Sequence, residues 1–103
     1  MRVSLEHHDS GWAASVKRTR EFGDFAVEVT AAPGHDHSKI RCEGVRVDHD
    51  EAWVRASWLA NAADCRQGEA ATRFQEMLDY AQSRRWYDQT RDEIAAHVVN
   101  REP

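Results

Sequence analysis

Histidine and carboxylate side chains gather at three places in this chain of 103 residues, which are His7-His8, His35-Asp36-His37 and Asp48-His49-Asp50. Imidazole and carboxylate groups are good ligands for zinc, nickel or iron. The candidate metal ligands are therefore His35, His37 and His49. A histidine between two carboxylates, as His49 is, is also a candidate general base.

The elements around these clusters predict that they lie apart. The 35–37 loop and the 48–50 segment flank one expected strand, residues 39–47, and the two ends of such a strand are about 30 Å apart. We therefore predict that the protein binds no transition metal tightly and needs no cofactor. A small metal-dependent protein or enzyme that uses the histidine-rich strand ends is the alternative.

Recognised catalytic motifs are missing from the sequence. It has no glycine-rich phosphate loop, no nucleophile elbow and no Cys–His pair at a known catalytic spacing. Cys42 and Cys65 lack the spacing of a metal or redox site, and we interpret both as reduced thiols that pack like small apolar residues. We therefore expect a protein without catalytic activity.

Aromatic residues and arginines suggest a different chemistry. The chain has four Trp, two Tyr and three Phe, and Trp and Arg are enriched among the residues that dominate protein interfaces. On one helix Trp53 and Trp58 would point about 140° apart. We therefore predict that Trp53 faces the sheet and that Trp58 lies at the rim. The candidate interface residues are Val54, Trp58, Arg84, Arg85, Trp86 and Tyr87.

Nucleic-acid binding is a further alternative. Lys17, Arg41 and Arg46 are expected on the solvent face of the strands, where basic groups can bind a single strand if aromatic platforms accompany them. Trp12 and Phe25 are instead expected on the apolar face. The formal net charge of −4 also argues against a general nucleic-acid binder.

The first half of the chain, residues 1–47, has the period-2 pattern of strands. Turn signals at Asp9-Ser10-Gly11 and Phe22-Gly23-Asp24 separate the first three strands, and short connections favour an antiparallel meander. In the fourth expected strand, residues 39–47, the apolar residues change face at Glu43-Gly44. We predict a bulge or bend at Gly44 that returns them to one face.

The second half has helical spacing. Asp48 and Glu51 are spaced as in a capping box and predict a helix that ends at Gln67-Gly68. A second helix is expected over about 69–83. A third is expected from Thr90 and would carry Ile94, His97 and Val98 inward. Because residues 53–59 are rich in strand formers, a fifth strand there is the alternative.

These elements predict one α+β domain, residues 1–103, with two layers. An antiparallel β-meander of about four strands (1–47) would be covered on one face by two or three α-helices (51–99). Residues 1–47 carry no net charge and residues 48–103 carry −4, so the helical layer would be acidic. The expected core residues are Trp12, Phe25, Val27, Val29, Trp53, Phe74, Leu78 and Ile94.

The sequence therefore favours a small non-catalytic binding or regulatory protein that acts through a protein–protein interface. Its partner would be another protein or an identical subunit. One specific version is a phage-type inhibitor, such as an anti-CRISPR-like protein, whose acidic layer covers a basic groove of a host complex. No apolar run is long enough to span a bilayer and no signal-peptide pattern begins the sequence, so we expect a cytoplasmic protein without membrane contact.

Overall fold

The computed structural model describes residues 1–9, 11–30, 34 and 38–101, which contain eight strands and two helices. The strands are β1 (Arg2–His8), β2 (Gly11–Lys17), β3 (Ala26–Thr30), β4 (Lys39–Cys42), β5 (Val45–Asp48), β6 (Glu51–Arg55), β7 (Tyr87–Asp88) and β8 (Glu93–Arg101). The helices are α1 (Ala56–Ala62) and α2 (Gly68–Ser83).

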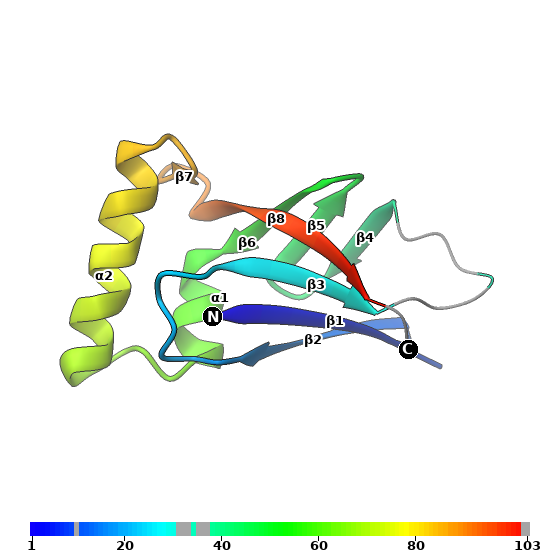
Figure 1. Cartoon of the computed structure of the whole chain (residues 1–103), viewed down its shortest axis with the longest axis horizontal. Helices are drawn as coiled ribbons and strands as arrows, with labels where there is room; N and C mark the ends of the chain where they lie inside the picture. The colour runs from blue at the N-terminus through cyan, green and yellow to red at the C-terminus, as the bar shows by residue number, and fades with distance from the viewer. Residues whose placement is uncertain (10, 31–33, 35–37, 102–103) are drawn as a thin grey trace.

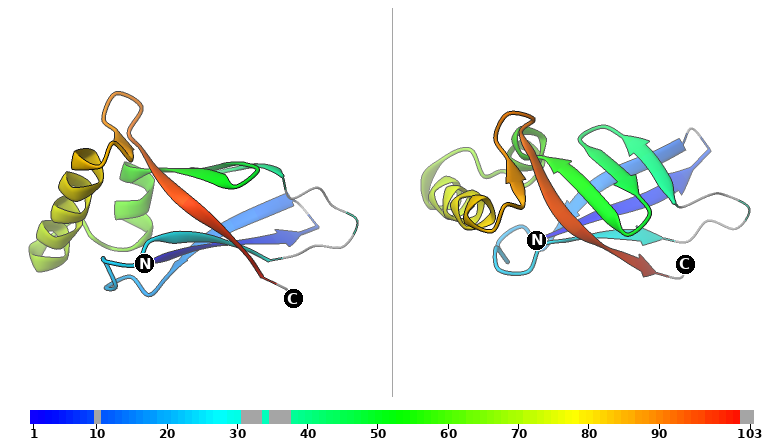
Figure 2. Two further views of the ribbon diagram at one scale, coloured as in Figure 1. Left: turned by 45° about the horizontal axis from the view of Figure 1, so that its top comes forward. Right: turned by 90° about the horizontal axis from the view of Figure 1, so that it is seen from above.

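The described strands form one mixed sheet that is nearly closed into a barrel (Figure 1). Their order is β2-β1-β3-β8-β6-β5-β4, and β7 pairs with β8. Strand β3 is parallel to its neighbours β1 and β8, and the other pairs are antiparallel. Figure 2 shows the sheet curling so that β2 and β4 approach each other, while both helices lie at one end of the strands.

The core lies inside the curved sheet and under the two helices. Every second residue of the central strands points inward, and Leu59 of α1 with Phe74 and Leu78 of α2 joins the same apolar cluster. The largest fully buried side chains are Met1, Val3, Leu5, Val27, Val29, Ile40, Val47, Val54 and Leu59. The helices therefore close one end of the barrel.

Most of the predicted core residues are inside. Those that are buried are Val27, Val29, Phe74, Leu78 and Ile94. Trp12, Phe25 and Trp53 are only partly buried. The barrel interior is filled mainly by branched aliphatic side chains, because a small closed sheet leaves room for few large rings.

The predicted two-layer α+β fold with a four-stranded meander is wrong. The chain is mostly β, and β3 pairs with β1 rather than with β2. The strand that follows the β1–β2 hairpin can join the sheet next to β2 or next to β1. In both cases it runs parallel to β1, so its direction is the same. Local sequence therefore predicts the strand and its direction, but not its neighbour.

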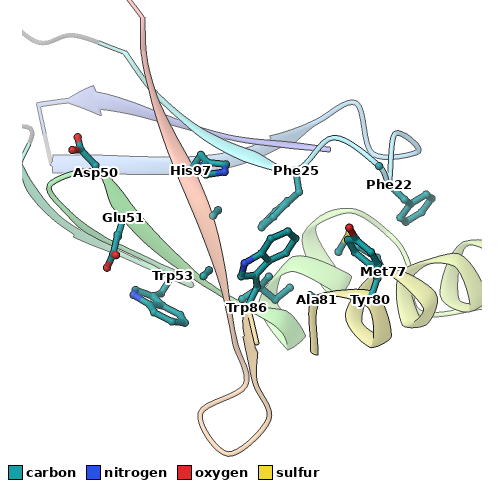
Figure 3. Close-up of a pocket in the computed structure, with 14 residues that line it drawn as sticks. Phe22, Phe25, Asp50, Glu51, Trp53, Met77, Tyr80, Ala81, Trp86 and His97 are labelled. Atoms are coloured by element: carbon teal, nitrogen blue, oxygen red, sulfur yellow. The ribbon is translucent and has the colours of Figure 1, made fainter. Parts of the chain in front are cut away.

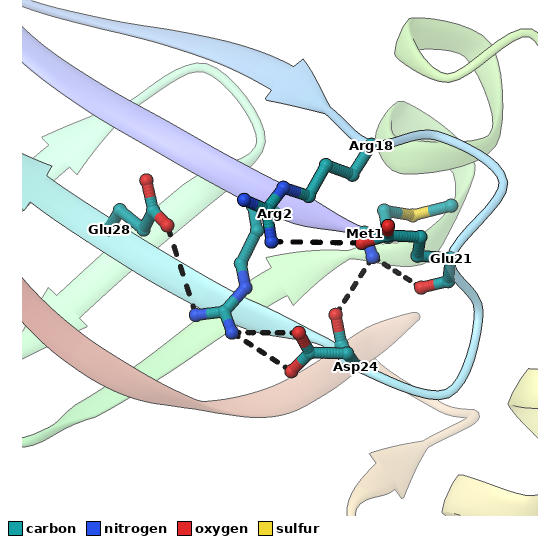
Figure 4. Close-up of polar contacts among 6 residues, drawn as sticks. All are labelled: Met1, Arg2, Arg18, Glu21, Asp24 and Glu28. Carbon is teal, nitrogen blue, oxygen red and sulfur yellow. Dashed lines mark hydrogen bonds and ion pairs between the residues drawn. The ribbon is translucent and has the colours of Figure 1, made fainter.

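Contacts at the start of β1 favour the parallel arrangement (Figure 4). The Met1 ammonium group donates hydrogen bonds to the carbonyl oxygens of Glu21 and Asp24, the latter at 2.8 Å. The Arg2 guanidinium binds both carboxylate oxygens of Asp24 at 2.8 and 3.0 Å and approaches Glu28 of β3 at 3.8 Å. These bonds hold the β2–β3 connection across the end of β1. Strand β3 therefore joins the sheet at the edge of β1 opposite to β2.

The expected single strand over 39–47 is a hairpin of β4 and β5. Ile40 pairs with Val47 and Cys42 pairs with Val45, with Glu43 and Gly44 as the two turn residues. Partners in a two-residue hairpin share one face, so the change of parity marks a chain reversal and not a bulge. Gly44 adopts a φ of +77°, a left-handed conformation that glycine adopts without steric cost.

The expected helix from Asp48 begins later than predicted, because residues 51–55 form β6. Asp48 pairs with Glu51, and His49, at a φ of +58°, and Asp50 make the turn between β5 and β6. Polar residues that cap helices also form tight turns, so the capping signal was ambiguous. The range 53–59, for which a fifth strand was the alternative, is divided: residues 53–55 belong to β6, and residues 56–59 belong to α1, which is limited to Ala56–Ala62.

The expected third helix from Thr90 is strand β8, at the centre of the sheet between β3 and β6. Ile94 and Val98 are four residues apart, a spacing that puts them on one face of a strand as well as of a helix. The side chain of His97 distinguishes the helix from the strand, because the expected helix would turn it inward, whereas in β8 it is exposed. The other expected helix, about 69–83, is confirmed as α2.

Asp92, in the turn before β8, caps helix α1 from a distant part of the sequence. Its carboxylate Oδ2 accepts a hydrogen bond from the Ser57 backbone N–H at 3.0 Å, and its Oδ1 accepts one from the Tyr87 hydroxyl at 3.1 Å. Its carbonyl oxygen also accepts a bond from Ala56 N–H at 2.8 Å. Asp92 therefore joins α1 to β7 and β8.

Candidate protein-binding groove

A groove of about 500 Å³ lies between α2 and the sheet (Figure 3). Strands β6 and β8, the β2–β3 connection, α2 and the segment before β7 all contribute to its walls. Its larger side chains are Phe22, Phe25, Trp53, Met77, Tyr80 and Trp86, together with Asp50, Glu51 and His97. Aromatic walls with a few polar groups are typical of binding sites.

An exposed aromatic pair stands at the rim of this groove. Tyr80 of α2 is 58% exposed and Trp86 is 42% exposed, and their rings meet edge to face at 5.9 Å. The Arg84 guanidinium lies 5.9 Å from the Tyr80 ring centre and 5.4 Å from that of Trp86. Tyr, Trp and Arg are the residue types that most often dominate binding energy at protein interfaces.

Trp86 is held by the backbone of the sheet. After α2 ends at Ser83, Arg85 adopts a φ of +64°, and the Trp86 carbonyl accepts a hydrogen bond from Ala95 N–H of β8 at 2.6 Å. The indole therefore projects from a fixed backbone position. A rigid aromatic side chain loses little conformational entropy when it is covered by a partner.

Trp53 forms part of the opposite wall, on the outer face of β6. The prediction that Trp53 faces the sheet from a helix is wrong. Trp53 lies on a strand of the sheet, and its neighbours Ala52 and Val54 take the inward positions. The Arg46 guanidinium stacks 5.5 Å from the Trp53 ring centre and pairs with the Glu93 carboxylate at 2.9 Å. Trp53 is thus held in place from β5 and β8.

One end of the groove is acidic and the other is apolar and aromatic. Figure 3 shows Asp50 and Glu51 at one end, Phe22, Met77 and Tyr80 at the other, and Trp86 between them. Asp50 and Glu51 are exposed and form no ion pair with any described residue. Arg84 and Arg85 directly precede Trp86 in the sequence, and they too are exposed and form no ion pair within the described ranges.

The predicted interface residues are divided by the structure. Trp86 lines the groove and the Arg84 guanidinium lies over its ring, whereas Arg85 is exposed but does not line the groove, and Val54 is 0% exposed and presents no surface. Tyr87 is half-buried and bound to Asp92. Burial and the hydrogen bond to this carboxylate raise the pKa of the Tyr87 phenol.

Trp58, the remaining predicted interface residue, packs against the β4–β5 turn. A Cβ atom on Gly44 would lie only 2.3 Å from Cγ and Cδ2 of the Trp58 ring. Trp58 is partly buried on the core cluster and does not line the groove. The Trp58 ring therefore occupies the space that a side chain at position 44 would need.

The two ends of residues 39–47 are closer to each other than predicted. Because β4 and β5 form a hairpin, the His49 N–H donates a hydrogen bond to the Ser38 carbonyl at 2.6 Å, so the two ends of residues 39–47 meet. The expected separation of about 30 Å is wrong for this reason. His35 and His37 lie outside the described residues. Within the described part of the chain, no three His, Cys, Asp or Glu side chains form a possible metal site.

Other candidate chemical groups are engaged within the fold. Arg46 is bound to Trp53 and Glu93, so only Lys17 and Arg41 of the three expected basic groups are fully exposed. Burial raises the pKa of the thiols of Cys42 and Cys65. Both cysteines are therefore poor nucleophiles at neutral pH.

Sequence reasoning missed most of the groove. Phe22 and Phe25 of the β2–β3 connection, Trp53 of β6 and Tyr80 of α2 come from three segments that only the sheet topology brings together. One sequence signal could have indicated that Tyr80 is exposed. Phe74, Leu78 and Ala81 define the buried stripe of α2, and position 80 lies on another face of the helix.

No family model, curated protein or solved structure matches this chain in the three comparisons. Neither helix in the described part of the chain is long and apolar enough to cross a membrane.

Proposed function

We propose that this protein is a small non-catalytic binding protein that regulates a partner protein by docking through the aromatic groove. The observation that carries the proposal is the exposed Tyr80–Trp86 pair, braced by Arg84 at the rim of a groove of about 500 Å³. Large exposed aromatic side chains next to a concave apolar surface mark interaction sites in small domains.

The pair leaves aromatic surface that a partner can cover. Tyr80 and Trp86 keep 58% and 42% of their surface exposed in the free protein. A partner that covers both rings would gain apolar burial at about 25 cal/mol per Å² and would desolvate the guanidinium stacked on them. The phage-type inhibitor stays one version of this function, supported by the small size and the acidic charge balance of the chain.

The test is a comparison of the wild-type protein with the double variant Tyr80→Ala/Trp86→Ala. Both are immobilised and exposed to extract from the source cells, and a captured protein is identified, purified and titrated against each. We expect about 30-fold weaker binding by the double variant, corresponding to roughly 2 kcal/mol. Val99→Ala, an exposed apolar residue of β8 that does not line the groove, is the matched control and should bind normally.

Two results would refute the proposal. One is a purified partner that binds the double variant as tightly as the wild type while thermal unfolding shows both to be folded. The other is a wild-type protein that binds neither a cellular protein nor a second copy of itself. The metal-dependent alternative remains a separate prediction, and metal analysis of tag-free protein tests it directly.

A further inference from the structure

A carboxylate and an indole ring follow each other on the outer face of β6, inside the groove. Glu51 and Trp53 are alternate residues of this strand, and their partners on β8 are His97 and Ala95. Alternate residues of a strand point to the same face, and their backbone positions are about 7 Å apart. The acidic end and the aromatic part of the groove are therefore separated by one such step along the strand.

The space above Ala95 suits a large apolar side chain. Trp53 is the partner of Ala95 on β6, and the Trp86 carbonyl accepts the Ala95 N–H on the other side, at 2.6 Å. All three residues line the groove, and Figure 3 shows the Trp86 ring between the acidic end and the side chains of α2. Because Ala95 carries only a methyl group, it leaves room between the two indole rings.

The charges in the groove favour a basic group at one end. Among the residues that line it, Asp50 and Glu51 carry the formal charges. Both are exposed, and neither forms an ion pair within the described part of the chain. At the aromatic end, the guanidinium groups of Arg73 and Arg84 lie 4.8 and 5.4 Å from the centres of groove rings. A basic side chain is therefore attracted to the acidic end and repelled at the aromatic end.

We propose that the partner enters this groove with an extended segment in which a large apolar side chain and a lysine or arginine are two residues apart. Side chains on one face of an extended segment repeat about every 7 Å, which is the step from Trp53 to Glu51. The apolar side chain covers Ala95, and the basic side chain meets Glu51 and Asp50. This proposal rests on the proposed function and names the chemistry of the partner.

Short peptides with blocked ends test this chemistry. The probes are Gly-Gly-Trp-Gly-Lys-Gly-Gly and its reverse, Gly-Gly-Lys-Gly-Trp-Gly-Gly, which cover both chain directions. Each is titrated into isotope-labelled protein and followed by NMR. We expect shifts of the Glu51, Trp53 and Ala95 amides and of the Trp86 indole N–H with at least one of them. The dissociation constant should be in roughly the millimolar range, because a flexible peptide loses conformational entropy when it binds.

The charge of the peptide should change its affinity in a fixed order. Replacement of the lysine by glutamine should weaken binding about fivefold, which is the effect of one exposed ion pair. Replacement by glutamate should weaken it at least about tenfold, because two carboxylates then face a third.

A pair of double variants assigns this preference to the groove. Asp50→Asn/Glu51→Gln removes both charges but keeps the shape of the side chains, and it should bind the lysine and glutamine peptides equally within about twofold. The matched control, Asp9→Asn/Glu43→Gln, removes two charges at exposed positions that do not line the groove. It should keep the fivefold preference, because a distant charge is screened by salt. The NMR spectra of both variants verify that they are folded.

The outcomes separate this proposal from the proposed function. Peptides that shift no groove resonance, a glutamate peptide that binds as tightly as the lysine peptide, or a lysine preference that persists in Asp50→Asn/Glu51→Gln would each refute the basic segment. A cellular partner that depends on Tyr80 and Trp86 would still leave the docking function standing. A lysine peptide that binds Tyr80→Ala/Trp86→Ala as tightly as the wild type would instead refute the aromatic pair as the docking site, while the preference for a basic segment would stand.

Discussion

Asp92 should carry a large share of the stability of this fold, because one side chain joins three elements. It accepts hydrogen bonds from the Ser57 N–H at the start of α1 and from the Tyr87 hydroxyl of β7, and it precedes β8 directly. It also adopts a φ of +55°, which costs most residues about 1–2 kcal/mol but is tolerated by Asp, Asn and Gly. Substitutions at this position separate the two effects.

The expected free energies of unfolding follow from these contacts. Asp92→Ala loses a helix cap worth about 1 kcal/mol, the bond to Tyr87 worth about 1 kcal/mol, and about 1 kcal/mol more from the backbone conformation, which gives a loss of about 3 kcal/mol. Asp92→Gly keeps the backbone conformation and should lose about 2 kcal/mol. Asp92→Asn can accept only one of the two bonds and should lose about 1 kcal/mol.

Urea unfolding followed by tryptophan fluorescence measures this series. The order Ala, Gly, Asn from least to most stable is the signature of a capping residue with left-handed backbone. If Asp92→Ala unfolds within about 0.5 kcal/mol of the wild type, the carboxylate is not a cap. If the Gly variant is as unstable as the Ala variant, the backbone conformation contributes nothing.

The Asp92 carboxyl group also makes the free energy of unfolding depend on pH in the acidic range. Burial acts to raise the pKa of Asp92, but the hydrogen bonds from Ser57 and Tyr87 outweigh it, and the net shift is downward. A carboxyl group with a lowered pKa in the folded state stabilises above its unfolded pKa of about 4, and this contribution is lost as the pH falls through the folded value. The advantage of wild type over Asp92→Asn should therefore shrink below about pH 4.

Two further predictions concern tight contacts. Gly44→Ala should cost about 2 kcal/mol or more, because φ is +77° and the new Cβ would lie 2.3 Å from the Trp58 ring. The cost should fall in a Trp58→Ala background, and equal costs in the two backgrounds would refute the contact. Arg46→Ala should cost about 1–2 kcal/mol, and Arg46→Lys should recover less than half of it, because an ammonium group cannot both stack on Trp53 and bind the Glu93 carboxylate. Urea unfolding measures both, and full recovery by Lys would contradict the second.

The sequence predicted those elements whose pattern has a single interpretation. Strands β1, β2 and β3 were located by alternation, and α2 by a stripe long enough to exclude a strand. Strand β6 was predicted only as an alternative to a helix, and β8 was missed, because alanines and pairs four residues apart fit both periods. The exposure of His97 distinguishes a strand from a helix in this segment, but the sequence alone does not show that exposure.

The long-range pairings were out of reach for another reason. The cap of α1 comes from Asp92, 35 residues after Ser57, and the capping signal at Asp48 belonged to a turn. The groove depends on the same kind of contact, because its walls come from segments that meet only after β8 enters the centre of the sheet. Of the residues that line the groove, only Trp86 was named from the sequence as an interface candidate, and that role stays a prediction.

Trp86 and Tyr87 provide the last prediction, because these neighbours separate binding from folding. Tyr87 is half-buried on Asp92, whereas Trp86 is exposed at the groove rim. Tyr87→Phe should lower stability by about 1 kcal/mol and leave partner binding unchanged. Trp86→Ala should weaken partner binding about tenfold and should also lower stability by about 2 kcal/mol, because its ring is 42% exposed and otherwise buried in the free protein.

Urea unfolding and titration with the purified partner test this pattern on both variants. Tyr87→Phe should also lose part of the alkaline sensitivity of the wild type, because the raised pKa of Tyr87 stabilises the fold below its unfolded pKa of about 10, and this contribution is lost as the pH rises through the folded value. If Trp86→Ala lowers stability but leaves partner binding unchanged, the ring contributes only to folding. Trp86 would then be a structural residue, and the exposed aromatic pair would no longer support a binding role.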